Sequence, residues 1–217
     1  MKSPTRSHRR PRPGRPSKRD NRDSRASLLP AAIKIFSERG FAAASLKDIT
    51  DEAGVSVGLV RHYFGSKEAL IAAADDQVLA ELRQVFASIL KNIDTNDGAE
   101  LLREIHERQL RILLPRIHLL FYLKHLVIER PAAAQKAIRE YYQMLQAHFV
   151  RLEAAGALRN DANKEWLAFL LMFVQLGPVL LSEQIESIIG KSLFTPEMAR
   201  ERGRAAGHLF AGILRPR

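Results

Sequence analysis

The sequence contains no cysteine, so neither disulfide bonds nor thiolate metal sites can contribute to its fold. Long hydrophobic runs are also missing. The most apolar stretch, residues 166–181, contains a glutamine, a glycine and a proline and is shorter than the ~20 residues that cross a bilayer. The first residues lack the apolar segment of a secretion signal. We therefore expect a soluble, cytoplasmic protein that does not enter a membrane.

The sequence signatures of common enzymes are missing as well. It shows no glycine-rich phosphate loop, no nucleophile–histidine–acid order and no paired acidic cluster. On a helix, His118 and His125 share a face but stand about two turns apart, too far to bind one ion without a third element. We therefore expect no catalytic residues, metal or cofactor, and interpret these histidines as structural or pocket-lining groups.

Positive charge is abundant but unevenly distributed. The 217 residues carry a formal net charge of +10. Residues 1–25 hold ten basic and two acidic side chains, a local net charge of +8, which leaves +2 for the rest of the chain. A basic arm on a nearly neutral body indicates an anionic partner such as the phosphates of nucleic acid.

The arm, residues 1–24, contains no leucine, isoleucine, valine or phenylalanine. Such a segment buries too little apolar surface to offset the entropy of ordering, so we expect it to be disordered when free. Its segment 13–16, PGRP, is similar to the core of minor-groove hooks, which makes Arg12 and Arg15 candidate contacts in an A·T-rich minor groove. A solvated tail that adds only nonspecific attraction is the alternative, and both interpretations stay open.

Helical periodicity starts after the arm and continues to the C-terminus, without any strand-type alternation. Apolar residues at positions 29, 32, 33 and 36 predict a first helix over 24–40, with Ser24 as its N-cap, Gly40 as its stop and a start or kink at Pro30. The fold class is therefore all-α. The later long helices are predicted over 67–91, 98–114, 115–129, 131–155, 164–190 (with a kink at the Gly177–Pro178 step) and 196–214.

Two short helices lie between these, over 46–53 and 57–63. Ser45 and Asp48 have the spacing of a capping box for the first of them. Gly54 suits a left-handed turn, and Ser56 is placed to cap the second. This arrangement is a helix-turn-helix over about 45–64, in which the second helix enters the major groove while the first crosses the DNA backbone.

The exposed side and the ends of the second helix supply the candidate DNA contacts. Arg61 suits a bidentate pair with guanine, His62 can donate to a base or a phosphate, and Gly58 permits close approach to the duplex. Hydroxyl, ammonium and backbone N–H groups at helix ends meet phosphates. The candidates in this segment are Ser45, Ser56, Val57, Gly58, Leu59, Arg61, His62, Tyr63 and Lys67.

Residues 45–70, SLKDITDEAGVSVGLVRHYFGSKEAL, resemble the DNA-binding signature of the TetR family of repressors. The chain departs from the family pattern at 61–63, where Arg-His-Tyr replaces the usual two tyrosines and a histidine. Arg61 thus stands in place of a tyrosine hydroxyl that would meet phosphate, and whether it contacts a base or a phosphate stays open. The matching positions are Ser45 for a usual threonine, Ile49, Ala53, Gly54, Val55, Ser56, Gly58, Phe64, Lys67 and Leu70.

The resemblance implies a DNA-binding domain over 25–72 and a domain for dimerisation and ligand binding over 73–217. It implies a homodimer through 164–190 and 196–214, which would form a four-helix bundle with their partners. It also implies a pocket within 98–172, where a small-molecule effector alters the spacing of the two DNA-reading heads. The implied function is a dimeric, sequence-specific repressor of a palindromic operator, although activation stays open.

The candidate pocket residues are His106, His118, Tyr122, His125, Trp166, Phe169 and Met172. Aromatic residues at helical spacing are more often core than cavity lining, so this assignment is an expectation only. Apolar residues favour a hydrophobic or amphipathic effector, while Arg111, Arg116 and Lys124 leave an anionic one open. The competing function is a nonspecific nucleoid-binding protein driven by the arm, which predicts steeply salt-dependent binding with little sequence preference.

Overall fold

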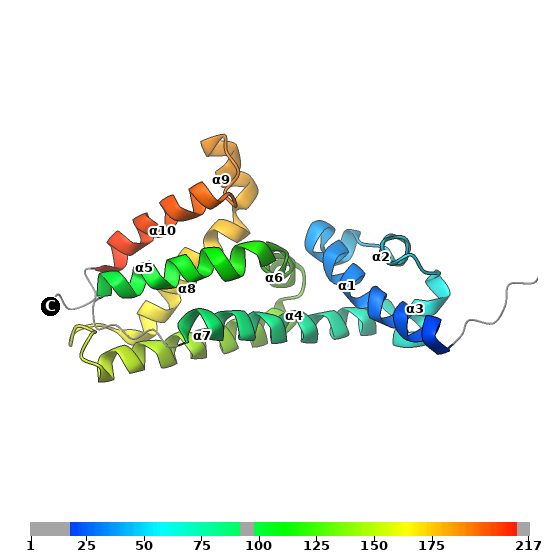
Figure 1. Cartoon of the computed structure of the whole chain (residues 1–217), viewed down its shortest axis with the longest axis horizontal. Helices are drawn as coiled ribbons and strands as arrows, with labels where there is room; N and C mark the ends of the chain where they lie inside the picture. Colours follow the sequence, from blue (N-terminus) through cyan, green and yellow to red (C-terminus); the bar gives the residue numbers. More distant parts are fainter. Residues whose placement is uncertain (1–17, 92–97, 212–217) are drawn as a thin grey trace, which may run out of the picture.

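The computed structural model describes residues 18–91 and 98–211, and the regular structure in those ranges is helical (Figure 1). The predicted all-α class is confirmed. The α-helices are α1 (Lys18–Ala43), α2 (Leu46–Ala53), α3 (Val57–Phe64), α4 (Lys67–Leu90), α5 (Gly98–Arg108), α6 (Ile117–Glu129), α7 (Pro131–Ala154), α8 (Lys164–Leu180), α9 (Ser182–Ile189) and α10 (Pro196–Ala211). A π-helical turn (Gln109–Leu113) and a 3-10 turn (Leu114–Arg116) join α5 to α6.

Two groups of helices are joined through the long helix α4 (Figure 1). At one end, α1 packs against α2, α3 and α4. Further along, α4 runs beside α7, and α5 to α10 complete the second group. The predicted division between residues 72 and 73 falls inside α4, so the two groups share this helix rather than a linker. Contacts between α1 and α6 are the most extensive of any helix pair.

The contact between α1 and α6 has an aromatic core. Tyr122 on α6 is fully buried, and its ring meets Phe36 and Phe41 of α1 edge-on, with centroids 6.4 and 5.1 Å away. Edge-to-face contacts of this kind are favourable because a positive ring edge meets a negative ring face. Tyr122, predicted to line an effector pocket, is instead part of the core between the two groups.

Asp75 on α4 supplies the polar partner of this core. The hydroxyl of Tyr122 donates to Asp75 Oδ1 (2.7 Å), and Arg130 donates to Asp75 Oδ2 (2.6 Å). The Arg130 guanidinium also lies 5.4 Å from the centre of the Phe41 ring. Burial raises the pKa of Asp75, while Tyr122 and Arg130 oppose that rise by stabilising the carboxylate. Because an unbonded buried polar group is costly, these bonds fix α4 against the end of α6.

Gly40 interrupts α1, as predicted, with φ 80° and ψ 174°. Two constraints require glycine here. The positive φ disfavours other residues, and a Cβ would lie only 2.2 Å from Glu129 Oε1. Glu129 uses this close approach to accept a hydrogen bond from the Ala42 N–H at 2.7 Å. The end of α1 is therefore bonded directly to the end of α6.

The helix α1 begins at Lys18, not at Ser24 as predicted. The prediction relied on the lack of apolar residues before Ser24, which limits burial but not helix formation. A helix already nucleated by its buried face extends at one backbone bond per residue, and lysine and arginine tolerate this conformation well. Pro30 lies inside α1 and neither starts nor breaks it.

The predicted helix 164–190 is two helices, α8 and α9, bent by 73°. Pro178 has no N–H and its ring crowds the carbonyl of residue 174, so the helix ends soon afterwards at Leu180. Apolar residues continue on both sides of the bend, so hydrophobic periodicity gave no sign of it. In the described ranges no single helix is long and apolar enough to span a membrane, and only this bent pair passes jointly by length and composition.

The predicted helix 98–114 also ends early, at Arg108, and gives way to the π-helical and 3-10 turns. Pro115 cannot donate to the carbonyl of Arg111, so regular α-helical bonding cannot continue through this segment. The ends of α2, α3, α4 and α7 agree with the predictions to within one residue.

Replacing Tyr122 by phenylalanine tests the bonded core. Tyr122→Phe keeps the ring but leaves one Asp75 oxygen without its buried donor, so we expect the free energy of unfolding to fall by about 1–2 kcal/mol. Urea unfolding followed by circular dichroism measures the change. Tyr142→Phe is the matched control, because the Tyr142 hydroxyl is bonded at a half-buried site to Gln146. Equal losses in the two variants would contradict the role given to Tyr122.

Candidate functional site

The turn between α2 and α3 is built by capping residues. The Asp48 N–H donates to Ser45 Oγ (3.1 Å), and the Ser45 N–H donates to Asp48 Oδ2 (2.9 Å), which completes the predicted capping box. The hydrogen bonds from Ser45 lower the pKa of Asp48. Gly54 ends α2 in the left-handed conformation, at φ 68° and ψ 30°. These local bonds, with Ile49 and Val60 fully buried, set the angle between α2 and α3.

One side of α3 faces solvent at the end of the molecule away from α5 to α10 (Figure 1). Val60 is fully buried, and Tyr63 packs partly against the same core. Leu59, predicted on the exposed side, is also half-buried against that core. The exposed candidates on α3 and at its N-cap are Ser56, Val57, Gly58, Arg61 and His62, and Ser45 before α2 is exposed as well.

Two candidates differ from their predicted roles. The Lys67 ammonium donates to the carbonyls of Phe41 (2.8 Å) and Ala44 (2.5 Å), so it closes the end of α1 inside the domain. Such bonds satisfy carbonyls that a helix end leaves without partners. Ser56 occupies the N-cap position of α3 but makes no side-chain capping bond. The exposed Ser56 hydroxyl is therefore not used by the cap.

The cations near α2 are mostly neutralised inside the domain. The ion pairs are Lys34–Glu52 (2.7 Å), Arg39–Asp48 (2.8 Å) and Lys47–Asp51 (2.5 Å). By contrast, Arg61 forms no ion pair with any residue of 18–91 or 98–211. Arg25 lies 5.9 Å from the centre of the Phe64 ring, beside the end of α3. Sequence reasoning counted Arg25 with the positive charge of residues 1–25, and only the packing of α1 against α3 shows how close it lies to Phe64.

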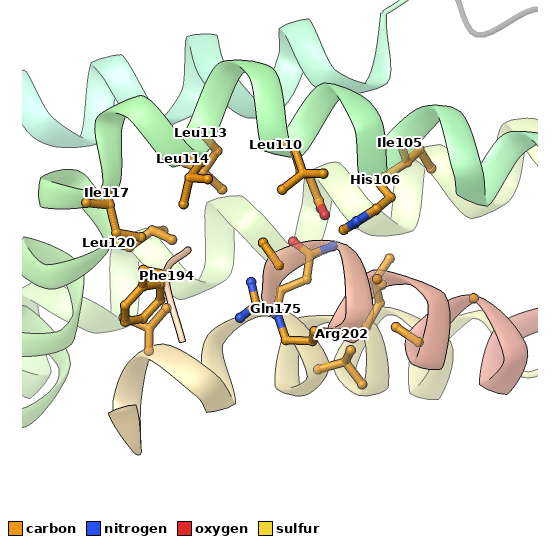
Figure 2. A pocket seen from close by; sticks show the side chains of 18 residues that line it. Ile105, His106, Leu110, Leu113, Leu114, Ile117, Leu120, Gln175, Phe194 and Arg202 are labelled. Atoms are coloured by element: carbon orange, nitrogen blue, oxygen red, sulfur yellow. The ribbon is translucent and has the colours of Figure 1, made fainter. Parts of the chain in front are cut away.

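A cavity of about 110 Å³ lies between α5, α8 and α10 (Figure 2). Its walls are mostly aliphatic side chains, and none of its lining residues is acidic. The polar lining residues are His106, Gln109, Gln175 and Arg202. A mainly apolar hollow with a few polar groups is typical of small-molecule sites, although those for drug-sized ligands reach roughly 300–1,000 Å³. This cavity therefore suits a compact ligand.

The segment that contains α2 and α3 matches a known family. A family model described as "Bacterial regulatory proteins, tetR family" matches residues 28–74. The regulator RaaS of Mycobacterium tuberculosis is 42% identical over 80 residues, 37% of each chain. The regulator BetI of Stenotrophomonas maltophilia is 41% identical over 63 residues, 29% of this chain and 32% of that protein. Residues 28–74 therefore form a DNA-binding domain of the TetR family.

The likeness of the chain to these curated relatives covers only about a third of their length. Similarity of fold extends further. A TetR regulator from Chloroflexus aurantiacus aligns with a TM-score of 0.72 at 20% identity, over 92% of this chain and all of the other. A TetR-family regulator from Agrobacterium tumefaciens aligns with a TM-score of 0.71 at 20% identity, over 90% of this chain and all of the other. At this identity the match establishes the fold alone.

Most of the predicted pocket residues lie outside this cavity. Only His106 lines the cavity. Trp166 is 60% exposed, Phe169 stacks on another ring and Met172 is buried in the core. Residue type was a poor guide because the rotation of each helix decides whether a ring faces cavity, core or solvent.

His118 and His125 line a separate groove beside α1 and α9. Among the described residues, no three His, Asp or Glu side chains are grouped to hold a metal ion. The polar cavity residues that sequence reasoning missed are Gln109, Gln175 and Arg202. No pattern marked them, because each belongs to a helix whose neighbours are set only by the tertiary fold.

The serines at the two N-cap positions test this description of the helix-turn-helix. Ser45→Ala removes a bonded cap and should lower the free energy of unfolding by about 1 kcal/mol. Ser56→Ala removes a hydroxyl without a capping bond and should cost only about 0.3 kcal/mol or less. Thermal and urea unfolding of the two variants, side by side, measure the difference. A loss at Ser56 equal to that at Ser45 would contradict the assignment of the caps.

Proposed function

We propose that this TetR-family protein is a homodimeric, sequence-specific DNA-binding repressor that leaves a palindromic operator when a small molecule occupies the cavity. The observation that carries the proposal is the exposed face of α3, held at a fixed angle by the capped turn. That face offers Val57, Gly58, Arg61 and His62 to a partner. A helix presented in this way fits the major groove.

Arg61 is the principal candidate for reading DNA. Its guanidinium is exposed, without an ion pair among the described residues, whereas Lys34, Arg39 and Lys47 of α1 and α2 are paired. A free guanidinium can form two parallel bonds to a guanine edge or bind a phosphate. A Cβ at Gly58 would meet no described atom within 4 Å, so internal packing does not require glycine there, and its small size lets a partner approach the backbone closely. Arg12 and Arg15, which lie outside the described residues, remain candidates for the adjacent minor groove.

The homodimer is supported by an unpartnered apolar face on α8. Trp166, Leu170 and Phe173 are 60%, 47% and 61% exposed and lie at i, i+4 and i+7, on one side of the helix. Leu209 on α10 is 71% exposed. Contiguous exposed apolar residues of this kind mark contact surfaces. A second copy of the chain, applied through the same face, would give the two-fold symmetry that a palindromic operator requires.

The position of the cavity supports its proposed effector role. Both α8 and α10 line the cavity, and both carry exposed apolar residues of the proposed dimer face. A ligand that favours one packing of these helices would change the relation between the two protomers and thus the spacing of their α3 helices. Operator binding and ligand binding are then coupled through the same helices.

Selection of bound duplexes from a random DNA pool, with the full chain at near-physiological salt, tests the proposal. We expect enrichment of a palindrome whose half-sites lie about 10 base pairs apart or a multiple of that distance. Enrichment of A·T content alone would replace the proposed regulator by a nonspecific nucleoid-binding protein.

Arg61→Gln should weaken binding to the selected operator by at least about 10-fold, because it removes a free guanidinium from the DNA-facing side of α3. Fluorescence anisotropy over a salt series measures the change. Relaxed preference at one base pair would assign Arg61 to a base, and a uniform loss with a shallower salt slope would assign it to a phosphate. Arg139→Gln on α7 is the charge-matched control and should bind as the wild type does. A normal affinity of Arg61→Gln would remove Arg61 from the interface.

Phe173→Glu should convert the dimer to a monomer, because it buries a charge at the centre of the proposed apolar face. We expect the mass from analytical ultracentrifugation to fall from twice the chain mass of 24.5 kDa to that mass. Val150→Glu is the control, since Val150 is also exposed, at 52%, but lies on α7. A wild-type chain that sediments as a monomer would contradict the proposed dimer.

A further inference from the structure

The cavity between α5, α8 and α10 contains a cation without a counter-ion. Arg202 on α10 reaches into it from one wall, and His106 on α5 reaches in from the other (Figure 2). Nη1 of Arg202 is buried and has no hydrogen-bond partner among the described residues. The lining includes no aspartate or glutamate. Its two glutamines are neutral and cannot balance a guanidinium.

This arrangement is costly for the free protein. An arginine stays protonated under ordinary conditions, so burying one end of its guanidinium is costly unless that end is paired or hydrogen-bonded. Burial lowers the pKa of Arg202, which reflects the loss of solvation of its charge. A buried polar group without a partner in a native structure calls for an explanation, and the position of Arg202 in the cavity wall points to a ligand that accepts from it.

His106 offers a second donor to the same space. Its Nε2 is also buried and unpartnered among the described residues. Burial, followed by the charge of Arg202, lowers the pKa of His106. The imidazole is therefore neutral near pH 7 and carries one N–H, which can point to a ligand oxygen.

Gly203 makes this placement of His106 possible. A Cβ on Gly203 would lie 2.0 Å from the nearest atom of the His106 ring and 2.2 Å from Nε2. The ring therefore packs directly on the backbone of α10 at Gly203, the residue that follows Arg202. Glycine at this position brings the unpartnered nitrogen of α5 close to the residue that supplies the unpartnered guanidinium.

The remaining walls are apolar. Ile117, Leu120 and Phe194 lie together at one end of the cavity, and Leu113 and Leu114 continue this surface (Figure 2). Such walls favour a hydrocarbon or aromatic body. The volume of about 110 Å³ limits that body to a small one, since an apolar cavity of roughly 150 Å³ holds benzene.

We propose that the cavity binds a small apolar monocarboxylate, whose oxygens accept from Arg202 and His106 and whose hydrocarbon body packs on the leucine-rich walls. The inference rests on the proposed effector role of the cavity and names the chemistry of the effector. A carboxylate has the charge and the acceptor oxygens that the two unpartnered groups require. An amine would add a second positive charge beside Arg202, and an alcohol would leave that charge unbalanced.

Calorimetric titration of the full chain, without DNA, with matched ligands tests the charge requirement. The probes are hexanoate and benzoate, with hexan-1-ol and benzyl alcohol as neutral counterparts of similar shape. We expect each acid to bind at least about 10-fold more tightly than its alcohol. Alcohols that bind as tightly as the acids, or acids that do not bind at millimolar concentration, would overturn the proposal. This comparison uses the wild-type chain and does not depend on the folding of a variant.

Arg202→Gln locates the site. It should weaken hexanoate binding by at least about 10-fold and leave hexan-1-ol nearly unaffected. Arg200→Gln is the matched control, because Arg200 is an exposed arginine on the same helix and does not line the cavity, and it should bind hexanoate as the wild type does. Equal losses in the two variants would overturn the assignment to Arg202.

Measuring how hexanoate changes binding to the operator found by duplex selection distinguishes the carboxylate site from the proposed effector role. Release of DNA by hexanoate, lost in Arg202→Gln, supports both. Hexanoate that binds through Arg202 without changing operator affinity supports the carboxylate site and contradicts the effector role. Selection of an operator by a chain that binds neither acid supports the DNA-binding function and contradicts the carboxylate site.

Discussion

The carboxylate of Asp75 lies where three parts of the chain meet, and much of the architecture depends on its two hydrogen bonds. Tyr122 brings α6 to it, and Arg130 brings the junction of α6 and α7. The aromatic ring of Tyr122 and the guanidinium of Arg130 both contact Phe41 of α1. Since a buried carboxylate is costly without such partners, α4 cannot shift easily relative to α6. The helices that carry α3 are thereby fixed against the larger group.

This constraint gives the proposed regulator a mechanical basis. Because residue 40 is glycine, Glu129 on α6 can bond to the end of α1. Lys67 on α4 bonds to the same end of α1. The position of α3 therefore follows α4 and α6 as one body. A change in the packing of the larger group would reach DNA through these contacts, with no flexible linker to absorb it.

The helix α8 has two distinct faces. Leu171, Val174 and Gln175 line the cavity, while Trp166, Leu170 and Phe173 are exposed on the proposed dimer face. A ligand and a second protomer would thus contact the same helix from different sides. The bend of 73° between α8 and α9 ends this face, and α10 closes the cavity by bringing Arg202 opposite His106. Ligand and partner can influence one another because they share rigid elements.

The sequence by itself determined the features that depend on neighbouring residues. The all-α class, the capping box of Ser45 and Asp48, the turn at Gly54 and the family all follow from spacing within a few turns of chain. Tertiary structure alone decided features that require distant segments to meet. Only the tertiary structure shows that Tyr122 lies in the core, that Lys67 donates to carbonyls of α1, and that Arg202 and His106 line the same cavity. The reason is that helix rotation and crossing depend on packing across the whole chain. Periodicity records which face of a helix is apolar, but not which partner covers it.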